Sequence, residues 1–229
     1  MNTSQKASIY LIRHGESLHN VDRTYPHRDP PLTDVGHHST KNIKMPVSPH
    51  LILISPMTRT LQTAMNIFPF LREPAPHPIP VQIWPELREA HDAICNIGLS
   101  RADMQARYPH FDFSECNEEW DYSLHTSEGA TARAERVRAR LKALAESYNN
   151  IAVITHRGLV AFLAKGRRFN VCEVREYRFA SDEEISDEQV RWGVNCDTLV
   201  EQDFGPTVLE FVENHTTSQG EDAHDLLVQ

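Results

Sequence analysis

Three short, continuous apolar runs stand out along this chain of 229 residues. They are rich in branched aliphatic side chains and cover residues 9–12, 51–54 and 151–154. Runs of this length without polar interruptions are typical of strands that are buried on both faces, as in a parallel sheet. Each run is followed by a segment that can form a helix, and this alternation predicts an α/β fold with a parallel sheet.

Each apolar run is also followed by cationic or imidazole side chains. Arg13 and His14 end the first run, Arg59 lies just beyond the second, and His156 follows the third. Arginine and histidine are seldom fully buried without partners, and ligands bind outside the carboxyl ends of strands in open α/β sheets. The three strand ends therefore predict one shared ligand site, where Gly15 allows a tight turn and a close approach to the backbone.

Helical spacing and turn residues predict the remaining elements. Helices are expected from residue 34 into the forties, over 58–68, from 100 to near 109, over 131–148 and over 159–165. Short strands are expected at 81–84, 173–179 and 207–212, the last two toward an edge of the sheet. The segments with the least pattern are 22–31, 90–128 and 180–206, and we expect these to form the walls of the pocket.

The helix expected over residues 131–148 carries five basic residues outside its apolar stripe. We interpret this set as a solvated face, and the alternative is that one member, Arg136, braces the catalytic residues. The set consists of Arg133, Arg136, Arg138, Arg140 and Lys142.

Composition narrows the class of protein. The content of 40% hydrophobic and 24% charged residues is ordinary for a globular protein, and we expect one α/β domain over residues 1–215 with a disordered polar tail at 216–229. A net charge of −9 argues against a nucleic-acid partner. Scattered cysteines, the lack of a signal-like start and the lack of a membrane-length apolar run predict a cytoplasmic protein without a membrane partner. The chain shows no apolar seam that would decide between a monomer and a homodimer.

The residue types at the strand ends suit phosphoryl transfer. A neutral imidazole is a competent nucleophile, so His14 can attack a phosphate ester and form a phosphohistidine. Guanidinium groups match a phosphoryl group as bidentate forks, which makes Arg13 and Arg59 natural clamps. His156 is expected opposite His14, where it donates to the same oxygens. The leaving oxygen also needs a proton, so a carboxylic acid must lie nearby.

An ordered set of motifs now makes the interpretation specific. The chain resembles the histidine phosphatase superfamily, in its phosphoglycerate mutase-like branch and closest to the broad-specificity fungal-type phosphatases. The matching motifs, in the family's order, are residues 11–17 (LIRHGES) with Asn20, Pro31-Leu32-Thr33-x-x-Gly36, Ser55-Pro56-x-x-Arg59-x-x-x-Thr63-Ala64, Leu87-x-Glu89, and His156 after a buried strand.

This resemblance implies a three-layer α/β/α sandwich around a mostly parallel sheet and a small phosphorylated substrate. It implies no metal and no organic cofactor. The roles that it carries over are His14 as nucleophile, Glu89 as general acid, and Arg13, Asn20, Arg59 and His156 as the phosphate pocket.

The segment around the implied general acid departs from the family pattern. Asn96 stands where a carboxylate is expected two positions before a glycine, so Asp92 is a second candidate for the acid beside Glu89. Arg157 follows the second histidine where many relatives have a small residue, and it either contacts a second anionic group or faces solvent. We expect a phosphomonoesterase. The alternatives are a phosphoglycerate-type mutase, a binding or regulatory protein with a phosphate pocket, and a specialised-pathway enzyme that reuses the pocket.

Overall fold

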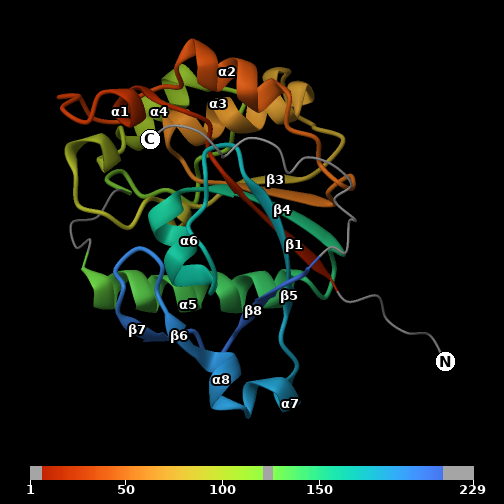
Figure 1. Ribbon diagram of the computed structural model, residues 1–229. Coiled ribbons are helices and arrows are strands. Elements are labelled where there is room, and N and C mark those ends of the chain that lie inside the picture. The colour runs from red at the N-terminus through yellow and green to blue at the C-terminus, as the bar shows by residue number, and fades with distance from the viewer. Residues whose placement is uncertain (1–6, 121–125, 214–229) are drawn as a thin grey trace, which may run out of the picture.

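A six-stranded sheet forms the centre of the computed structural model, which describes residues 7–120 and 126–213 (Figure 1). Its strands are β1 (Ser8–Arg13), β2 (Leu51–Ile54), β3 (Val81–Ile83), β4 (Asn150–Thr155), β5 (Val174–Phe179) and β8 (Leu209–Phe211). They lie in the order β3-β2-β4-β1-β5-β8. Only β5 runs against its neighbours within this sheet, so the predicted mostly parallel sheet is confirmed.

The register of the parallel strands brings their carboxyl ends together. β1 and β4 pair from Ser8 opposite Asn150 to Arg13 opposite Thr155, and Ile54 of β2 lies opposite Ile154 of β4. The residues that follow these three strands therefore meet at one edge of the sheet.

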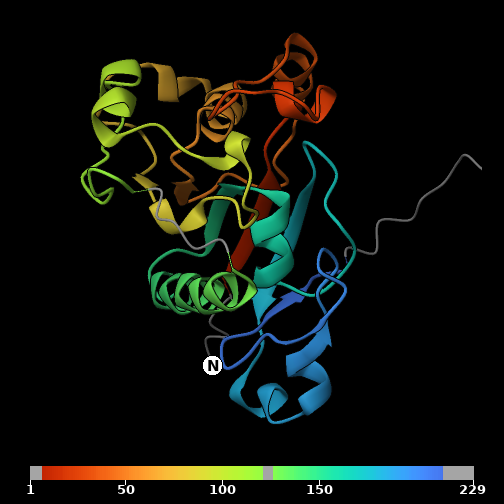
Figure 2. The same cartoon turned by 90° about the vertical axis from the view of Figure 1, so that its left-hand side faces the viewer.

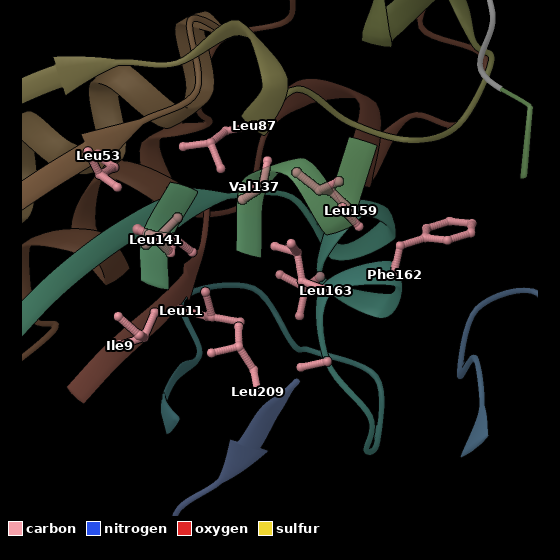
Figure 3. Packing of buried hydrophobic residues seen from close by; sticks show 14 of the residues in the cluster. Ile9, Leu11, Leu53, Leu87, Val137, Leu141, Leu159, Phe162, Leu163 and Leu209 are labelled. Atoms are coloured by element: carbon pink, nitrogen blue, oxygen red, sulfur yellow. The ribbon is translucent and has the colours of Figure 1, made fainter. Parts of the chain in front are cut away.

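Helices cover both faces of the sheet. On one face lie α2 (Asp34–Lys41) and α3 (Thr58–Ile67), and on the other lie α5 (Ser127–Leu144) and α6 (Arg157–Leu163), which gives three layers (Figures 1 and 2). Side chains alternate along the buried strands: Ile9 and Leu11 join the core beneath α5 and α6, whereas Ile12 joins the core beneath α3. Figure 3 shows the first of these cores, where each fully buried leucine or isoleucine stabilises the fold by about 1.5–3 kcal/mol. The predicted three-layer sandwich is confirmed.

Shorter elements complete the described chain. In the upper layer of Figure 1 lie α1 (Leu18–Val21) and α4 (Arg101–Arg107). The connections also form three 3₁₀ turns: η1 (Pro69–Arg72), η2 (Pro85–Leu87) and η3 (Ile94–Asn96). After β5 the chain forms α7 (Asp182–Ile185), α8 (Glu188–Arg191) and the two-stranded sheet of β6 (Trp192–Val194) and β7 (Glu201–Asp203). The sequence did not predict these last four elements, because the segment is polar and lacks a clear period.

Most predicted elements lie within a few residues of the observed ones, and β8 is indeed at an edge. The long helix begins and ends four residues earlier than predicted, because Thr126 caps it by accepting the backbone N–H of Gly129. The predicted tail at 216–229 lies outside the described residues. No helix in the described part of the chain is long and apolar enough to cross a bilayer.

Two expectations about exposed or pocket-lining segments are wrong. Arg133 and Arg138 of α5 are buried rather than solvated, and Arg138 donates to the carbonyl of Phe162 and to the carboxylate of Glu135, both at 2.8 Å. The segment 90–128 was expected to form a wall of the pocket. Its residues 111–120 instead pack four side chains into the core beneath α3: Phe111, Phe113, Cys116 and Trp120. The aromatic content of that segment was the signal for a core.

Candidate active site

A cavity of about 550 Å³ opens at the carboxyl ends of β1 and β4. Its wall combines strand ends with loops from across the chain, including the predicted walls 22–31 and 90–128. The lining side chains are Arg13, His14, His19, Asn20, Arg23, Glu89, His91, Asn96, Arg157 and Arg168. Every one of them is polar or charged, so the cavity is built for a hydrophilic and anionic ligand.

His14 is held as a neutral imidazole with one free nitrogen. Its Nδ1 lies 2.7 Å from the carbonyl oxygen of Gly15, and a carbonyl only accepts, so Nδ1 carries the proton. Burial, together with the charges of Arg59 and Arg13, holds the pKa of His14 well below its usual value. The imidazole therefore stays neutral, and Nε2 keeps the lone pair that a nucleophile requires.

A second buried histidine, His156, lies beside His14, and the two ring centres are 5.2 Å apart. Its Nε2 lies 2.8 Å from the hydroxyl of Ser55, the residue that follows β2. Its Nδ1 has no hydrogen-bond partner within residues 7–120 and 126–213. Burial and the charge of Arg59 hold the pKa of His156 well below its usual value.

The two candidate clamps occupy different positions. Arg13 lines the cavity and donates to the carbonyl of Phe169 at 2.7 Å. Arg59 is fully buried, does not line the cavity among the described residues, and donates to the carbonyl of Cys95 and to Oδ1 of Asn96, both at 3.0 Å. Asn96, which stands where the family pattern has a carboxylate, thus accepts a hydrogen bond from Arg59. Burial and neighbouring arginines lower the pKa of Arg13 to about 10, which reflects the density of positive charge here.

Asn20 is oriented by two residues of its own motif. Its Oδ1 accepts the backbone N–H and the hydroxyl of Ser17, each at 3.0 Å. Because that hydroxyl donates to Asn20, it accepts from Nδ1 of His19 at 2.8 Å, and Nε2 of His19 accepts from the Asn20 amide at 3.2 Å. His19 was not among the predicted site residues, although its position between His14 and Asn20 was a signal for the cavity.

The motif glycines permit close backbone packing around the nucleophile. A Cβ on Gly15 would lie 2.5 Å from the methyl group of Thr40, and one on Gly36 would lie 2.0 Å from the carbonyl oxygen of Glu16. The backbone N–H of Gly15 also donates to Thr63 of α3 at 3.0 Å. These contacts explain why the separate motifs of the sequence belong together: they fix one loop after β1.

The two candidate acids are found in different surroundings. Glu89 is buried at the cavity wall, where its carboxylate accepts the backbone N–H groups of Ala90 at 2.7 Å, Leu159 at 2.9 Å and Gly158 at 3.3 Å. Asp92 is exposed and does not line the cavity among the described residues. Glu89 is therefore brought together with His14, and Asp92 is not.

Arg133 braces the turn that presents Glu89. Its guanidinium donates to the carbonyls of Glu86 at 3.1 Å, Arg88 at 2.6 Å and Glu89 at 3.1 Å. Arg136, the residue suggested for this role by the sequence, is exposed and pairs with the carboxylate of Glu86 at 2.7 Å. The missed signal was spacing: Arg133 shares an i, i+4 row with Val137 and Leu141 of the buried face.

One buried carboxylate ties together three lining residues of the cavity. Asp197, in the connection between β6 and β7, contacts His91, Arg157 and Arg168. These partners hold the pKa of Asp197 well below its usual range, and the hydrogen bond to Asp197 raises the pKa of His91. The sequence offered no signal for this cluster beyond Arg157, because Asp197 is distant from its partners along the chain.

A buried neutral histidine, a second histidine and clustered guanidinium groups at the ends of parallel strands define a phosphoryl-binding α/β protein. The chain matches the histidine phosphatase superfamily (branch 1) over residues 9–170, and it belongs to that superfamily. This confirms the family that the motifs predicted.

Two curated relatives are similar in sequence. The adenosylcobalamin/alpha-ribazole phosphatase of Escherichia coli (strain K12) is 32% identical over 162 residues, which are 68% of this chain and 76% of the relative. A probable phosphatase of Schizosaccharomyces pombe (strain 972 / ATCC 24843) is 36% identical over 121 residues. That match covers 49% of this chain and 54% of the relative, so the chain spans about half the length of the yeast protein. Both relatives are named as phosphatases, one of them as a probable phosphatase, in agreement with the predicted class of enzyme.

Solved structures show the same fold. The ecdysone phosphate phosphatase from Bombix mori has a TM-score of 0.60 and 15% identity, and the match covers 97% of this chain and 98% of that one. An alpha-ribazole-5'-P phosphatase from Escherichia coli K-12, described as putative, has a TM-score of 0.54 and 24% identity, with 76% and 92% covered. In the described chain, no group of three or more His, Cys, Asp or Glu side chains is arranged to hold a metal ion.

The bracing role of Arg133 predicts a loss of activity. Arg133→Met removes three hydrogen bonds from the turn of Glu89, and a displaced catalytic group costs about 100-fold in rate. Steady-state kinetics on an aryl phosphate measure the loss, and circular dichroism verifies the fold. Arg136→Met on the same helix is the control and should stay within about twofold of wild type. Equal activities of the two variants would contradict the role of Arg133.

The buried neutral histidines predict that stability falls in acid. Burial and arginine charges lower the pKa of His14 and His156, and they lower that of His19 to about 3. Below about pH 6.5 the unfolded chain takes up protons that the folded chain refuses, so the free energy of unfolding falls by up to about 1.4 kcal/mol per pH unit for each histidine. Urea unfolding at pH 7.5, 6.5 and 5.5 measures this slope. His19→Gln should give a flatter slope, and an unchanged slope would contradict the low pKa of the half-buried His19.

Proposed function

We propose that this chain hydrolyses a small phosphorylated metabolite through a phosphohistidine on His14. The single observation that carries this proposal is the state of His14: Nδ1 donates to the carbonyl of Gly15, and the ring stays neutral among guanidinium groups. Nε2 then faces the space where the same cations attract a phosphoryl group. The same arginine charges therefore keep the nucleophile neutral and attract the phosphoryl group that it attacks.

The phosphoryl oxygens are held by groups around this nitrogen. Arg13 and Asn20 line the cavity, and Nδ1 of His156 is a buried polar atom that no protein group in the described residues engages. Arg59 lies behind the cavity wall, where it donates to the lining residue Asn96, and its positive charge acts on the cavity from there. Together these groups stabilise the charge that spreads over the equatorial oxygens in the transition state.

The reaction proceeds in two displacements. Nε2 of His14 forms a bond to phosphorus as the ester P–O bond breaks, and the leaving oxygen takes a proton from the Glu89 carboxyl group. Water then attacks the phosphohistidine, and Glu89 accepts the proton of that water. We assign the acid to Glu89 rather than Asp92 because only Glu89 is buried at the cavity wall.

The named relatives support the hydrolysis of a phosphomonoester. One of them is an adenosylcobalamin/alpha-ribazole phosphatase and another a probable phosphatase. The family motif is continuous through the nucleophile loop, and both histidines and both motif arginines are present.

The nucleophile is tested by substitution and by trapping. His14→Ala should lower kcat by at least about 1000-fold, because the phosphohistidine cannot form. Release of inorganic phosphate from a panel of phosphorylated metabolites and an aryl phosphate measures the effect. Wild type quenched during turnover should carry acid-labile, base-stable phosphate on His14. A His14→Ala protein with more than a tenth of wild-type turnover would overturn the mechanism, and transfer of the phosphoryl group to an added acceptor metabolite would indicate a mutase.

The assignment of the acid is tested by a matched pair of variants. Glu89→Gln should lower kcat by about 10²–10⁴-fold on an alkyl phosphate, whose leaving group needs the proton. The loss should be much smaller on 4-nitrophenyl phosphate, whose leaving group departs as a stable anion. Asp92→Asn is the control and should retain wild-type rates on both. A large loss in Asp92→Asn, with Glu89→Gln unaffected, would exchange the two roles.

A further inference from the structure

The cavity holds more positive charge than one phosphoryl group uses. Four guanidinium groups line it, those of Arg13, Arg23, Arg157 and Arg168, and Arg59 lies behind its wall. Two carboxylates of the described chain face them, Glu89 at the wall and Asp197 beneath it. The excess is three positive charges, whereas a phosphoryl group brings about two negative charges at neutral pH.

Two of the lining arginines form a cluster of their own around Asp197. Arg13 lies beside His14 at the end of β1, but Arg157 and Arg168 are grouped around Asp197, which approaches from the connection between β6 and β7. The Asp197 side chain is 1% exposed, whereas those of Arg157 and Arg168 are 35% and 55% exposed. The buried carboxylate thus holds Arg168 by hydrogen bonds and Arg157 by an ion pair, and both arginines line the cavity.

Both arginines keep donors that Asp197 does not use. Nε of Arg157 lies 3.4 Å from Oδ1 of Asp197 as an ion pair without a hydrogen bond, whereas Arg168 donates to that oxygen from Nε at 3.1 Å and from Nη2. Within the described residues, no protein hydrogen bond engages Nη1 or Nη2 of Arg157 or Nη1 of Arg168. These N–H groups form a preorganised fork of the kind that recognises carboxylate or phosphate.

The two arginines line the same cavity of about 550 Å³ as His14, so one small molecule can reach both groups. Their positive charges also help to lower the pKa of Arg13, and that of Arg157 lowers the pKa of His19. No apolar side chain of the described chain lines the cavity, so the part of the substrate beyond the phosphoryl group is met by charge and hydrogen bonds.

We propose that Arg157 and Arg168, anchored by Asp197, form a second anion subsite, and that the substrate is a phosphomonoester with a second anionic group, a carboxylate or another phosphate. This inference rests on the proposed phosphatase function and specifies its substrate class. Asp197 is a positioning residue in this scheme, because it contacts the two arginines and not the substrate.

Two pairs of probe compounds test the subsite and identify the second anion. 3-Phosphoglycerate and glycerol 3-phosphate differ by a carboxylate in place of a hydroxymethyl group. Fructose 1,6-bisphosphate and fructose 6-phosphate differ by a second phosphate. The wild-type kcat/KM should be at least about tenfold higher for the anionic member of one pair, since a charge-assisted hydrogen bond contributes that much. The pair that shows the preference tells whether the second group is a carboxylate or a phosphate.

Variants then assign the preference to the two arginines. In the double variant Arg157→Gln, Arg168→Gln the ratio of kcat/KM within the preferred pair should fall toward one. Asp197→Asn should lower the same ratio, mainly through KM of the anionic member. Arg167→Gln is the matched control: Arg167 neighbours Arg168 but pairs with Glu173 and does not line the cavity, so its ratio should equal that of wild type.

The outcomes separate this inference from the proposed function. Hydrolysis of the probes without preference in either pair, or a preference that survives the double substitution, overturns the subsite and leaves the phosphatase intact. No hydrolysis of the four probes or of 4-nitrophenyl phosphate overturns the proposed function itself. A preference that disappears in the double variant and persists in Arg167→Gln supports the subsite.

Discussion

The parallel pairing of β1 with β4 is the constraint on which the site depends. Arg13 lies opposite Thr155, and a histidine follows each of them, so the pairing brings His14 and His156 together. The N–H of His14 also donates to the carbonyl of Thr155 at 3.1 Å. A slip of one residue would exchange the two faces of the strand and separate the imidazoles. The close packing of the two faces of β1 into different cores, Ile9 and Leu11 in one and Ile12 in the other, opposes that slip. The hydrophobic core therefore sets a distance that the chemistry requires.

The charges around His14 are unfavourable until an anion binds. Arginine side chains are buried beside neutral histidines, and their mutual repulsion together with desolvation lowers the pKa of Arg13 to about 10. The chain as a whole carries a net charge of −9, so the positive cavity is a local feature that attracts a phosphorylated ligand into a negative protein. A bound dianion would relieve this repulsion, and the core of three layers supplies the stability that holds the cations in place.

Local sequence patterns predicted the strands of the central sheet and the loop after β1, because these features follow from neighbouring residues. Buried runs predicted the strands, and the ordered motifs pointed to His14, His156 and Glu89, which the structure brings to one edge of the sheet. What the sequence could not predict depends on distant contacts. Asp197 meets its partners only after the segment of β6 and β7 folds over α6, and polar loops carry no period that announces such a contact. Arg133 was wrongly predicted to be solvated for a different reason. The sequence alone does not show the backbone carbonyls that accept its hydrogen bonds and allow it to be buried.

This division between patterned and unpatterned segments has a chemical counterpart. The groups proposed for the phosphoryl transfer, His14, Arg13 and His156, come from strand ends that the core holds in place. The arginines that meet the remainder of the substrate are set by Asp197, from a small sheet that packs outside the central one. Changes in that outer segment can alter the arrangement of Arg157 and Arg168 without disturbing the pairing of β1 and β4. A fold built in this way can keep one reaction while its substrate changes, because the reaction depends on the core and the choice of substrate depends on a loop.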